Sequence, residues 1–154
     1  MTDTKYSSII LCRFGVIFLK RTDLTNLNNV TNIHMIGIGG ISMSGIAIIL
    51  KRLGFNVTGS DLVHGDMIDI LINEGIDVFI GTNKENVKNA DMVVYTAAIS
   101  KETNEEYLEA INLSIPTLER APFLGSLLKQ YTSPICVAGM HGKTTTTSMI
   151  ASLL

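Results

Sequence analysis

The chain has 154 residues, of which 46% are hydrophobic and 17% are charged, and its formal net charge is −2. This length allows one well-buried domain and is too short for two full ones. The composition excludes a disordered chain, and the small net charge provides no basic field for nucleic acid or an anionic membrane. We therefore expect a small-molecule partner, with no nucleic acid and no membrane, and any phosphate group must be bound by a local site.

Residues 1–31 lie outside the pattern of the rest of the chain. Residues 6–21, "YSSIILCRFGVIFLKR", are largely apolar, but Arg13 divides the run, and a membrane span needs about 20 apolar residues. A signal peptide would need a basic start and a small-residue cleavage site, so export is also disfavoured. We treat residues 1–31 as an N-terminal extension ending in a polar linker, and we expect a cytoplasmic protein.

The two cysteines, Cys12 and Cys136, lie in apolar runs far apart in the sequence. Neither has a His or Cys neighbour at a metal-ligand spacing, so a disulfide framework or a zinc site is disfavoured. We expect two buried thiols in a reducing compartment.

From residue 32 onward, short apolar runs alternate with helical stretches. The runs are rich in Ile and Val, as is typical of buried parallel strands. They cover residues 33–39, 55–61, 76–81, 91–98, 115–119 and 134–139.

Between these runs, apolar residues recur three and four positions apart, which places them on one face of a helix that can cover a sheet. The clearest examples are Ile46, Ile49, Leu50 and Leu53, followed by Met67, Ile70 and Leu71. Gly54 and Gly75 stand where a helix would end, a position that favours a residue tolerant of left-handed backbone. The order predicts an α/β fold with a doubly wound, mostly parallel, Rossmann-like sheet.

The first predicted strand leads into a glycine loop that opens the first helix. The loop consists of Gly37, Ile38, Gly39, Gly40, Ile41 and Ser42. The first two glycines allow a tight turn and let a diphosphate approach the N–H groups at the helix N-terminus. In a dinucleotide fingerprint a third glycine would stand where this chain has Ser42.

Asp61 ends the second predicted strand, close to where an acidic residue would receive ribose hydroxyls. Together with the loop, it predicts a site for a nucleotide diphosphate. The alternative is structural: the glycines only make a tight turn, and Asp61 caps a helix.

A second glycine-containing loop follows the last predicted strand and opens another helix. It consists of Gly139, Met140, His141, Gly142, Lys143, Thr144 and Thr145. In a phosphate-binding loop the backbone N–H groups wrap the phosphates, the lysine neutralises the β and γ oxygens, and the next hydroxyl holds Mg²⁺. Lys143 and Thr144 are therefore candidate catalytic residues, with Thr144 the candidate metal ligand. The usual leading glycine is Val137 here, and a threonine-rich helix start with an incidental lysine is the structural alternative.

Five stretches together resemble the N-terminal part of the Mur ligases. They are "HMIGIGGISMSGIA" (34–47), "GSD" (59–61), "TAAI" (96–99), "ERAPFL" (119–124) and "AGMHGKTTTTSM" (138–149). The resemblance runs from residue 32 to the end, and the combination is specific where each stretch alone is not. Ser42 and Met140 depart from the family, in which glycine and threonine are more usual at these positions.

The resemblance implies that residues 32–132 bind the UDP part of a sugar substrate, with residues 37–42 facing its diphosphate. The positions that match those around the uridine and phosphates are Asp61, Thr96, Ala97, Ala98, Ile99 and Arg120. Residues 133–154 then supply the first strand, phosphate loop and helix start of a truncated ATP-binding domain, which implies ATP and Mg²⁺ as cofactors.

The resemblance implies that in the whole enzyme ATP would phosphorylate the lactoyl carboxylate of UDP-N-acetylmuramate and leave as ADP. The amine of L-alanine would then attack the acyl phosphate and displace phosphate, which is a step of peptidoglycan precursor synthesis. The resemblance places the alanine site outside this chain, so we expect the chain alone to be inactive. Three alternatives remain: a sister ligase that attaches a preformed peptide to the same sugar nucleotide, an NAD-dependent oxidoreductase, and a non-catalytic nucleotide-sensing module. The NAD interpretation leaves Lys143 without a purpose.

Overall fold

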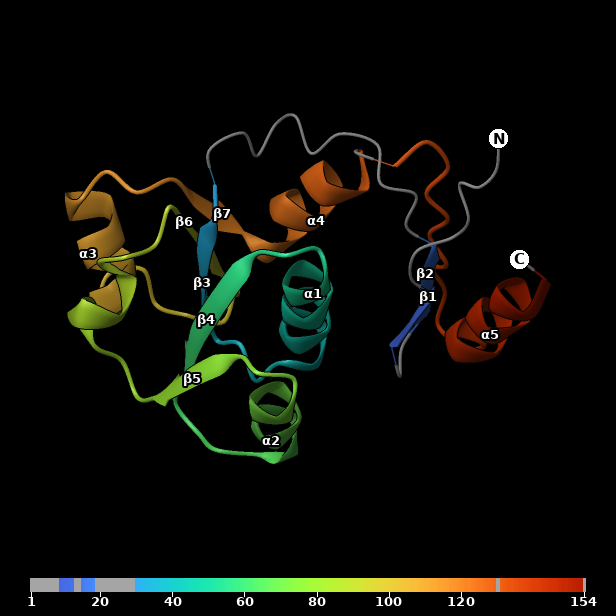
Figure 1. Ribbon diagram of the computed structural model, residues 1–154, viewed down its shortest axis with the longest axis horizontal. Coiled ribbons are helices and arrows are strands. Elements are labelled where there is room, and N and C mark those ends of the chain that lie inside the picture. The colour runs from blue at the N-terminus through green and yellow to red at the C-terminus, as the bar shows by residue number, and fades with distance from the viewer. Residues whose placement is uncertain (1–8, 13–14, 19–29, 130, 154) are drawn as a thin grey trace, which may run out of the picture. The chain divides into compact units, whose positions relative to one another are not determined.

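The computed structural model describes residues 30–129 and 131–153, together with the backbone of residues 9–12 and 15–18 (Figure 1). The chain divides into two compact units: residues 26–125 form one, and residues 1–25 with 126–154 form the other.

The larger unit contains a sheet of five parallel strands. These are β3 (Asn32–Ile36), β4 (Asn56–Asp61), β5 (Asp77–Ile80), β6 (Met92–Tyr95) and β7 (Thr117–Glu119). Their order across the sheet is β5-β4-β3-β6-β7, so the chain builds outward from β3 in one direction and then from β6 in the other. The predicted doubly wound parallel sheet is confirmed.

The central strands are the most apolar because both of their faces are covered. All four residues of β6 are buried, as are the last four of β3. The edge strand β5 instead leaves Phe79 and Ile80 exposed.

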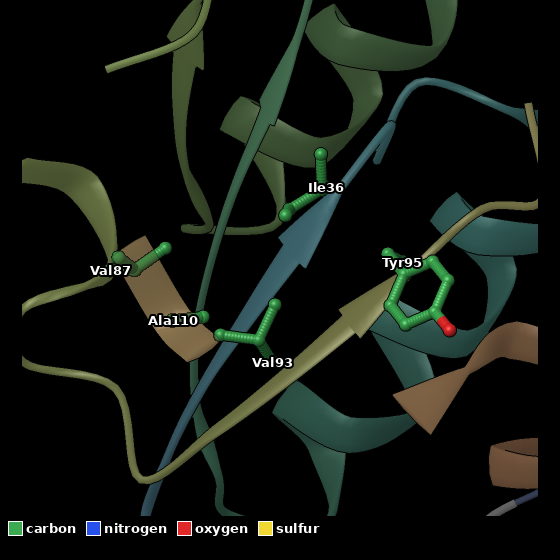
Figure 2. Close-up of a cluster of buried hydrophobic side chains, with 5 residues drawn as sticks. All are labelled: Ile36, Val87, Val93, Tyr95 and Ala110. Carbon is green, nitrogen blue, oxygen red and sulfur yellow. The ribbon is translucent and has the colours of Figure 1, made fainter. Parts of the chain in front are cut away.

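The helices of this unit cover both faces of the sheet. They are α1 (Ile41–Arg52), α2 (Asp66–Asn73) and α3 (Glu105–Asn112), with the short 3-10 helix η1 (Lys84–Val87) and the start of α4 (Arg120–Leu128). Figure 1 shows α1 and α2 along one face and α3 along the other. A cluster formed by Ile36, Val87, Val93, Tyr95 and Ala110 fixes α3 and η1 against β3 and β6 (Figure 2).

The predicted face of α1 is largely confirmed, because Ile46, Ile49 and Leu50 are buried. In α2 the prediction is partly wrong: Ile68 and Leu71 are buried, whereas Ile70 is 40% exposed. Positions 68 and 71 are three residues apart and share the sheet-facing side, and position 70 lies on the opposite side of this short helix.

Gly54 and Gly75 have φ values of +95° and +76°, so the predicted left-handed helix ends are confirmed.

The described part of the smaller unit contains a two-stranded sheet and a helix. Strands β1 (Ile9–Cys12) and β2 (Gly15–Phe18) pair antiparallel, with Ile9 opposite Phe18, in a segment where no strand was predicted. Helix α5 (Lys143–Leu153) follows the second glycine loop. The predicted strand over residues 134–139 is wrong: these residues have no regular structure. A strand requires a paired neighbour, and no described strand pairs with them.

Cys136 lies in this irregular segment and is exposed, so the prediction of a buried thiol is wrong for it. The side chain of Cys12 lies outside the described residues. Among the described residues, no helix has the length and apolar character needed to cross a membrane.

Candidate functional site

A pocket of about 920 Å³ opens at the carboxyl ends of the strands in residues 26–125. It lies between β3 and β6, where the strand order reverses, and open α/β sheets bind ligands at this switch point. Three segments supply most of its lining: the glycine loop, the end of β4 with the residues that follow it, and the loop after β6. Thr82, which follows β5, also lines it. The lining residues among the predicted set are Gly37, Gly39, Gly40, Asp61, Thr96, Ala98 and Ile99.

The glycine loop is held by the end of β4. The N–H groups of Gly37 and Ile38 donate to the Ser60 carbonyl oxygen at 2.8 and 3.0 Å. Gly37 has a φ of +78°, and a Cβ atom there would collide with the Thr96 side chain. A Cβ atom on Gly59 would lie 2.7 Å from the carbonyl oxygen of Met35. The glycines in "GIGG" and "GSD" therefore permit a close approach between the loop and its neighbours.

Ile38 contributes only its backbone N–H to the loop, through the hydrogen bond to the Ser60 carbonyl oxygen. Its side chain is fully buried in the core, so it does not line the pocket. Ile41 and Ala97 are exposed and also lie outside the pocket lining.

The start of α1 is an open site for an anion. Helix α1 begins after Gly40, which has no side-chain cap, and the first bonded N–H is that of Ser44, donating to the Gly40 carbonyl oxygen at 2.8 Å. Within the described part of the chain, the N–H groups of residues 41–43 have no acceptor. Free N–H groups and the positive end of the helix dipole attract negative charge.

Arg120 adds a full positive charge at this helix start. Its Nη1 atom donates to the Ser42 Oγ atom at 2.7 Å, although the two residues are 78 positions apart in the sequence. Both residues were predicted to bind substrate, and the fold brings them into direct contact. They lie next to the loop glycines of the pocket and are not themselves among its lining residues.

Asp61 is bonded to the glycine loop. Its Oδ2 atom accepts the N–H of Gly39 at 2.8 Å, and its Oδ1 atom accepts the N–H of Val63 at 3.4 Å. Helix α2 begins after Gly65 without a side-chain cap, so Asp61 does not cap that helix. The carboxylate faces the pocket from the end of β4.

Sequence reasoning missed Glu106, which is fully buried beside the pocket wall. Burial acts to raise the pKa of Glu106, but the facing His34 and hydrogen bonds from Ser60 and Asn86 outweigh it and hold the pKa below 4.5. A glutamate in the first turn of a helix is normally read as a helix-dipole residue, so its burial had no sequence signal.

The second loop belongs to the smaller unit and is exposed. Gly142 has a φ of +78°, and no atom lies near the place where its Cβ would be. The Lys143 ammonium donates to the carbonyl oxygens of Gly139 and Met140, the latter at 3.2 Å. Thr144 and Thr145 lie in the first turn of α5 and are exposed.

This loop has the features that a polyphosphate requires: an open glycine turn, a helix start and a lysine whose contacts are loop carbonyls that phosphate oxygens can replace. Among the described residues, no group of three or more His, Cys, Asp or Glu side chains could hold a metal ion. A Mg²⁺ ion here would depend on the Thr144 hydroxyl together with phosphate oxygens.

An open, doubly wound α/β sheet with a glycine loop at its switch point defines a Rossmann-like nucleotide-binding domain. A sequence model of the Mur ligase family, catalytic domain, matches residues 32–132, and the chain belongs to the Mur ligase family.

Individual relatives agree with this assignment. The UDP-N-acetylmuramate--L-alanine ligase of Acetivibrio thermocellus is 47% identical over 136 residues, which are 88% of this chain and 29% of that protein. The solved UDP-N-acetylmuramate-alanine ligase of Thermotoga maritima has a TM-score of 0.62 at 30% identity, over 64% of this chain and 23% of that one.

A second solved structure has a different printed activity. It is UDP-N-acetylmuramate:L-alanyl-gamma-D-glutamyl-meso-diaminopimelate ligase from Neisseria meningitides, with a TM-score of 0.68 at 36% identity, over 79% of this chain and 38% of that one. This chain thus spans between 23% and 38% of the length of these three proteins.

Proposed function

We propose that this chain is the sugar-nucleotide-binding part of an ATP-dependent ligase that joins L-alanine to UDP-N-acetylmuramate. The observation that carries the proposal is the contact between Arg120 and Ser42 at the uncapped start of α1, beside the pocket. The relatives named as alanine ligases support the choice of substrate.

The diphosphate of the substrate would lie at the start of α1. There the free N–H groups of residues 41–43 donate to phosphate oxygens, and the Arg120 guanidinium adds charge-assisted hydrogen bonds. The uridine would occupy the pocket, with Asp61 available to ribose hydroxyls and with Thr96, Ala98 and Ile99 forming the facing wall.

Residues 139–145 would bind the phosphates of ATP, and the Thr144 hydroxyl would hold Mg²⁺. When bound, ATP supplies the phosphoryl group that activates the carboxylate of the sugar. Lys143 would exchange the carbonyl oxygens of Gly139 and Met140 for phosphate oxygens, which places its charge where negative charge develops.

A sister ligase that attaches a preformed peptide to the same sugar nucleotide is the second candidate. The likeness to the Neisseria meningitides enzyme favours it, whereas 47% identity to an alanine ligase favours the first candidate. Both would bind UDP-N-acetylmuramate, so the identity of the amine substrate distinguishes them. Residues 26–125 would bind the diphosphate of this substrate in the same way in either enzyme.

The affinity of an Arg120→Ala variant for UDP-N-acetylmuramate tests the proposal. Loss of a charge-assisted contact to a diphosphate should weaken binding by about 10- to 100-fold in calorimetry. Arg52→Ala is the matched control, because Arg52 lies in the last turn of the same helix and pairs only with Glu74, at 3.0 Å, among the described residues. Equal affinities for the two variants would contradict the proposed diphosphate position.

A further inference from the structure

A buried carboxylate lies behind the wall of the pocket and is not part of its lining. Glu106 is in the first turn of α3 and is fully buried. Its Oε2 atom accepts the Ser60 hydroxyl, and its Oε1 atom accepts the Asn86 side-chain amide at 2.6 Å and the Asn83 N–H at 3.3 Å. One side chain therefore joins α3, the end of β4 and the segment around η1.

Two of these contacts, Ser60 and Asn83, are themselves lining residues of the pocket or direct neighbours of one, and Glu106 lies two positions from a lining residue. Ser60 itself lines the pocket, and its carbonyl oxygen accepts the N–H groups that hold the glycine loop. Thr82 lines the pocket and immediately precedes Asn83. Asn104 lines the pocket two residues before Glu106, and its side chain caps α3 by accepting the Tyr107 N–H at 2.8 Å.

His34 closes the network from β3. Its Nδ1 atom is 2.9 Å from the Thr58 Oγ1 atom, and its Nε2 atom, which has no hydrogen-bond partner, is 3.6 Å from the Glu106 Oε2 atom. Both side chains are fully buried. His34 is the one ionisable side chain among the described residues that lies within 4 Å of the Glu106 carboxylate, and the partners from β4 and η1 are uncharged.

Burial of a carboxylate is unfavourable because the charge loses its hydration, and apolar side chains of similar volume are often equally stable in the same place. A carboxylate differs from an apolar side chain because its two oxygens accept several hydrogen bonds and so hold several donors at defined positions. Here the three donors come from two segments, the end of β4 and residues 83–86, and the carboxylate that holds them comes from a third, α3.

We propose that Glu106 is a positioning residue for the sugar-nucleotide pocket, setting through Ser60 and residues 82–86 the spacing between the glycine loop and the loop after β6. This inference rests on the proposed function of the same pocket. Glu106 does not touch the substrate.

The test is calorimetry of the chain with UDP-N-acetylmuramate at pH 7, accompanied by thermal unfolding, for the wild type and three variants. In Glu106→Ala three donors lose their acceptor, and the dissociation constant of the folded fraction should rise about tenfold. In Glu106→Gln the amide oxygen still accepts from Asn86, and the Ser60 hydroxyl can turn to accept from the amide nitrogen. That conservative variant should stay within about threefold of the wild type.

The third variant, Leu71→Ala, separates positioning from stability. Leu71 is fully buried in α2 and does not line the pocket, so its truncation should lower the melting temperature without changing the affinity of the folded fraction. Unchanged affinity in Glu106→Ala, with only a lower melting temperature, would overturn the proposal.

If Glu106→Ala does not fold, Ser60→Ala carries the same test, because it cuts the link to β4 and keeps the carboxylate. Wild-type affinity in Ser60→Ala would overturn the proposal. A wild-type chain that does not bind UDP-N-acetylmuramate would contradict the proposed function itself, and with it this inference.

Discussion

At the scale of single residues, two charged side chains reach the glycine loop and act in opposite senses. The Asp61 carboxylate accepts the N–H of Gly39 at 2.8 Å, and the Arg120 guanidinium donates to Ser42 at 2.7 Å. The Asp61 carboxylate repels a phosphate group and already accepts the Gly39 N–H. The Arg120 guanidinium and the free N–H groups of residues 41–43 instead attract a phosphate group. We therefore expect the diphosphate at the start of α1 rather than over Gly39.

Lys143 gives the first prediction. In a chain that carries the whole ligase, Lys143→Ala should lower turnover about 10²- to 10³-fold, because it removes a charge that stabilises the transferring phosphoryl group. The melting temperature should barely change, since the side chain is exposed and bonds only loop carbonyls in the described structure. Lys88→Ala, which removes an exposed lysine paired with Glu85 at 2.7 Å, is the control and should keep normal turnover. Near-normal turnover of Lys143→Ala would show that Lys143 is only a solvated side chain.

Asp91 gives a pH prediction. Its carboxylate accepts the N–H groups of Asn32 at 2.8 Å and Thr31 at 2.9 Å, and these backbone bonds hold the pKa of Asp91 below 3.8. A carboxyl group whose pKa is lower in the folded than in the unfolded chain contributes stability that is present above the unfolded value and is lost as the pH falls through the folded value. Glu106, whose pKa is also lowered, acts in the same direction.

The free energy of unfolding should therefore fall as the pH drops below about 4. Urea unfolding between about pH 3 and about pH 7 measures this. Asp91→Asn should be less stable at neutral pH and should show a smaller loss in acid. An acid slope that is the same in both proteins would contradict the role given to Asp91.

At the scale of elements, α1, α2 and α3 end in the same motif. In α3 the N–H of Ile115 donates to the Ala110 carbonyl oxygen at 2.8 Å and that of Ser114 to the Ile111 carbonyl oxygen at 3.0 Å. This is the Schellman pattern, which needs left-handed backbone at one position. Helices α1 and α2 use Gly54 and Gly75 there, whereas α3 uses Ser114 at a φ of +56°.

Ser114→Gly should therefore stabilise the chain by about 0.5–1 kcal/mol, because a side chain in the left-handed region is strained and glycine is not. Gly54→Ser is the reciprocal change and should destabilise by a similar amount, since no atom lies within 4 Å of its added Cβ and only the backbone strain remains. Urea midpoints of both variants measure the effect. A destabilised Ser114→Gly would contradict this account of the helix end.

The sequence pattern predicted the strands and helices of the larger unit because buried side chains make apolar residues recur at regular spacings. The runs of Ile and Val gave the five parallel strands, and Gly54 and Gly75 marked two helix ends. Ile70 was assigned to the wrong face because a helix of eight residues contains too few turns to define one stripe. The failed strand at 134–139 has strand-like composition, but pairing is non-local.

The candidate site was predicted less completely, for a related reason. Ser42 and Arg120 were named separately, and only the fold shows that they touch. Glu106 and its donors come from three different segments, so no local pattern marks the carboxylate as buried.

At the scale of the whole chain, the two phosphate-type loops belong to different compact units. Residues 26–125 hold the glycine loop, Asp61 and Arg120, and the unit that includes residues 126–154 holds the loop at 139–145. The site in the larger unit is built entirely from its own residues. Sugar-nucleotide binding should therefore be a property of this chain, whatever else the ligase requires.

Parallel calorimetric titration of the chain with UDP-N-acetylmuramate and with NAD tests directly which nucleotide residues 26–125 bind. We expect UDP-N-acetylmuramate to bind and NAD to bind far more weakly or not at all. Both ligands carry a diphosphate, so the start of α1 alone does not separate them; the reason is that residues 32–132 match the Mur ligase family and that the relatives are named for UDP-N-acetylmuramate. NAD binding that is tighter than UDP-N-acetylmuramate binding would contradict the assignment of this site to a sugar nucleotide.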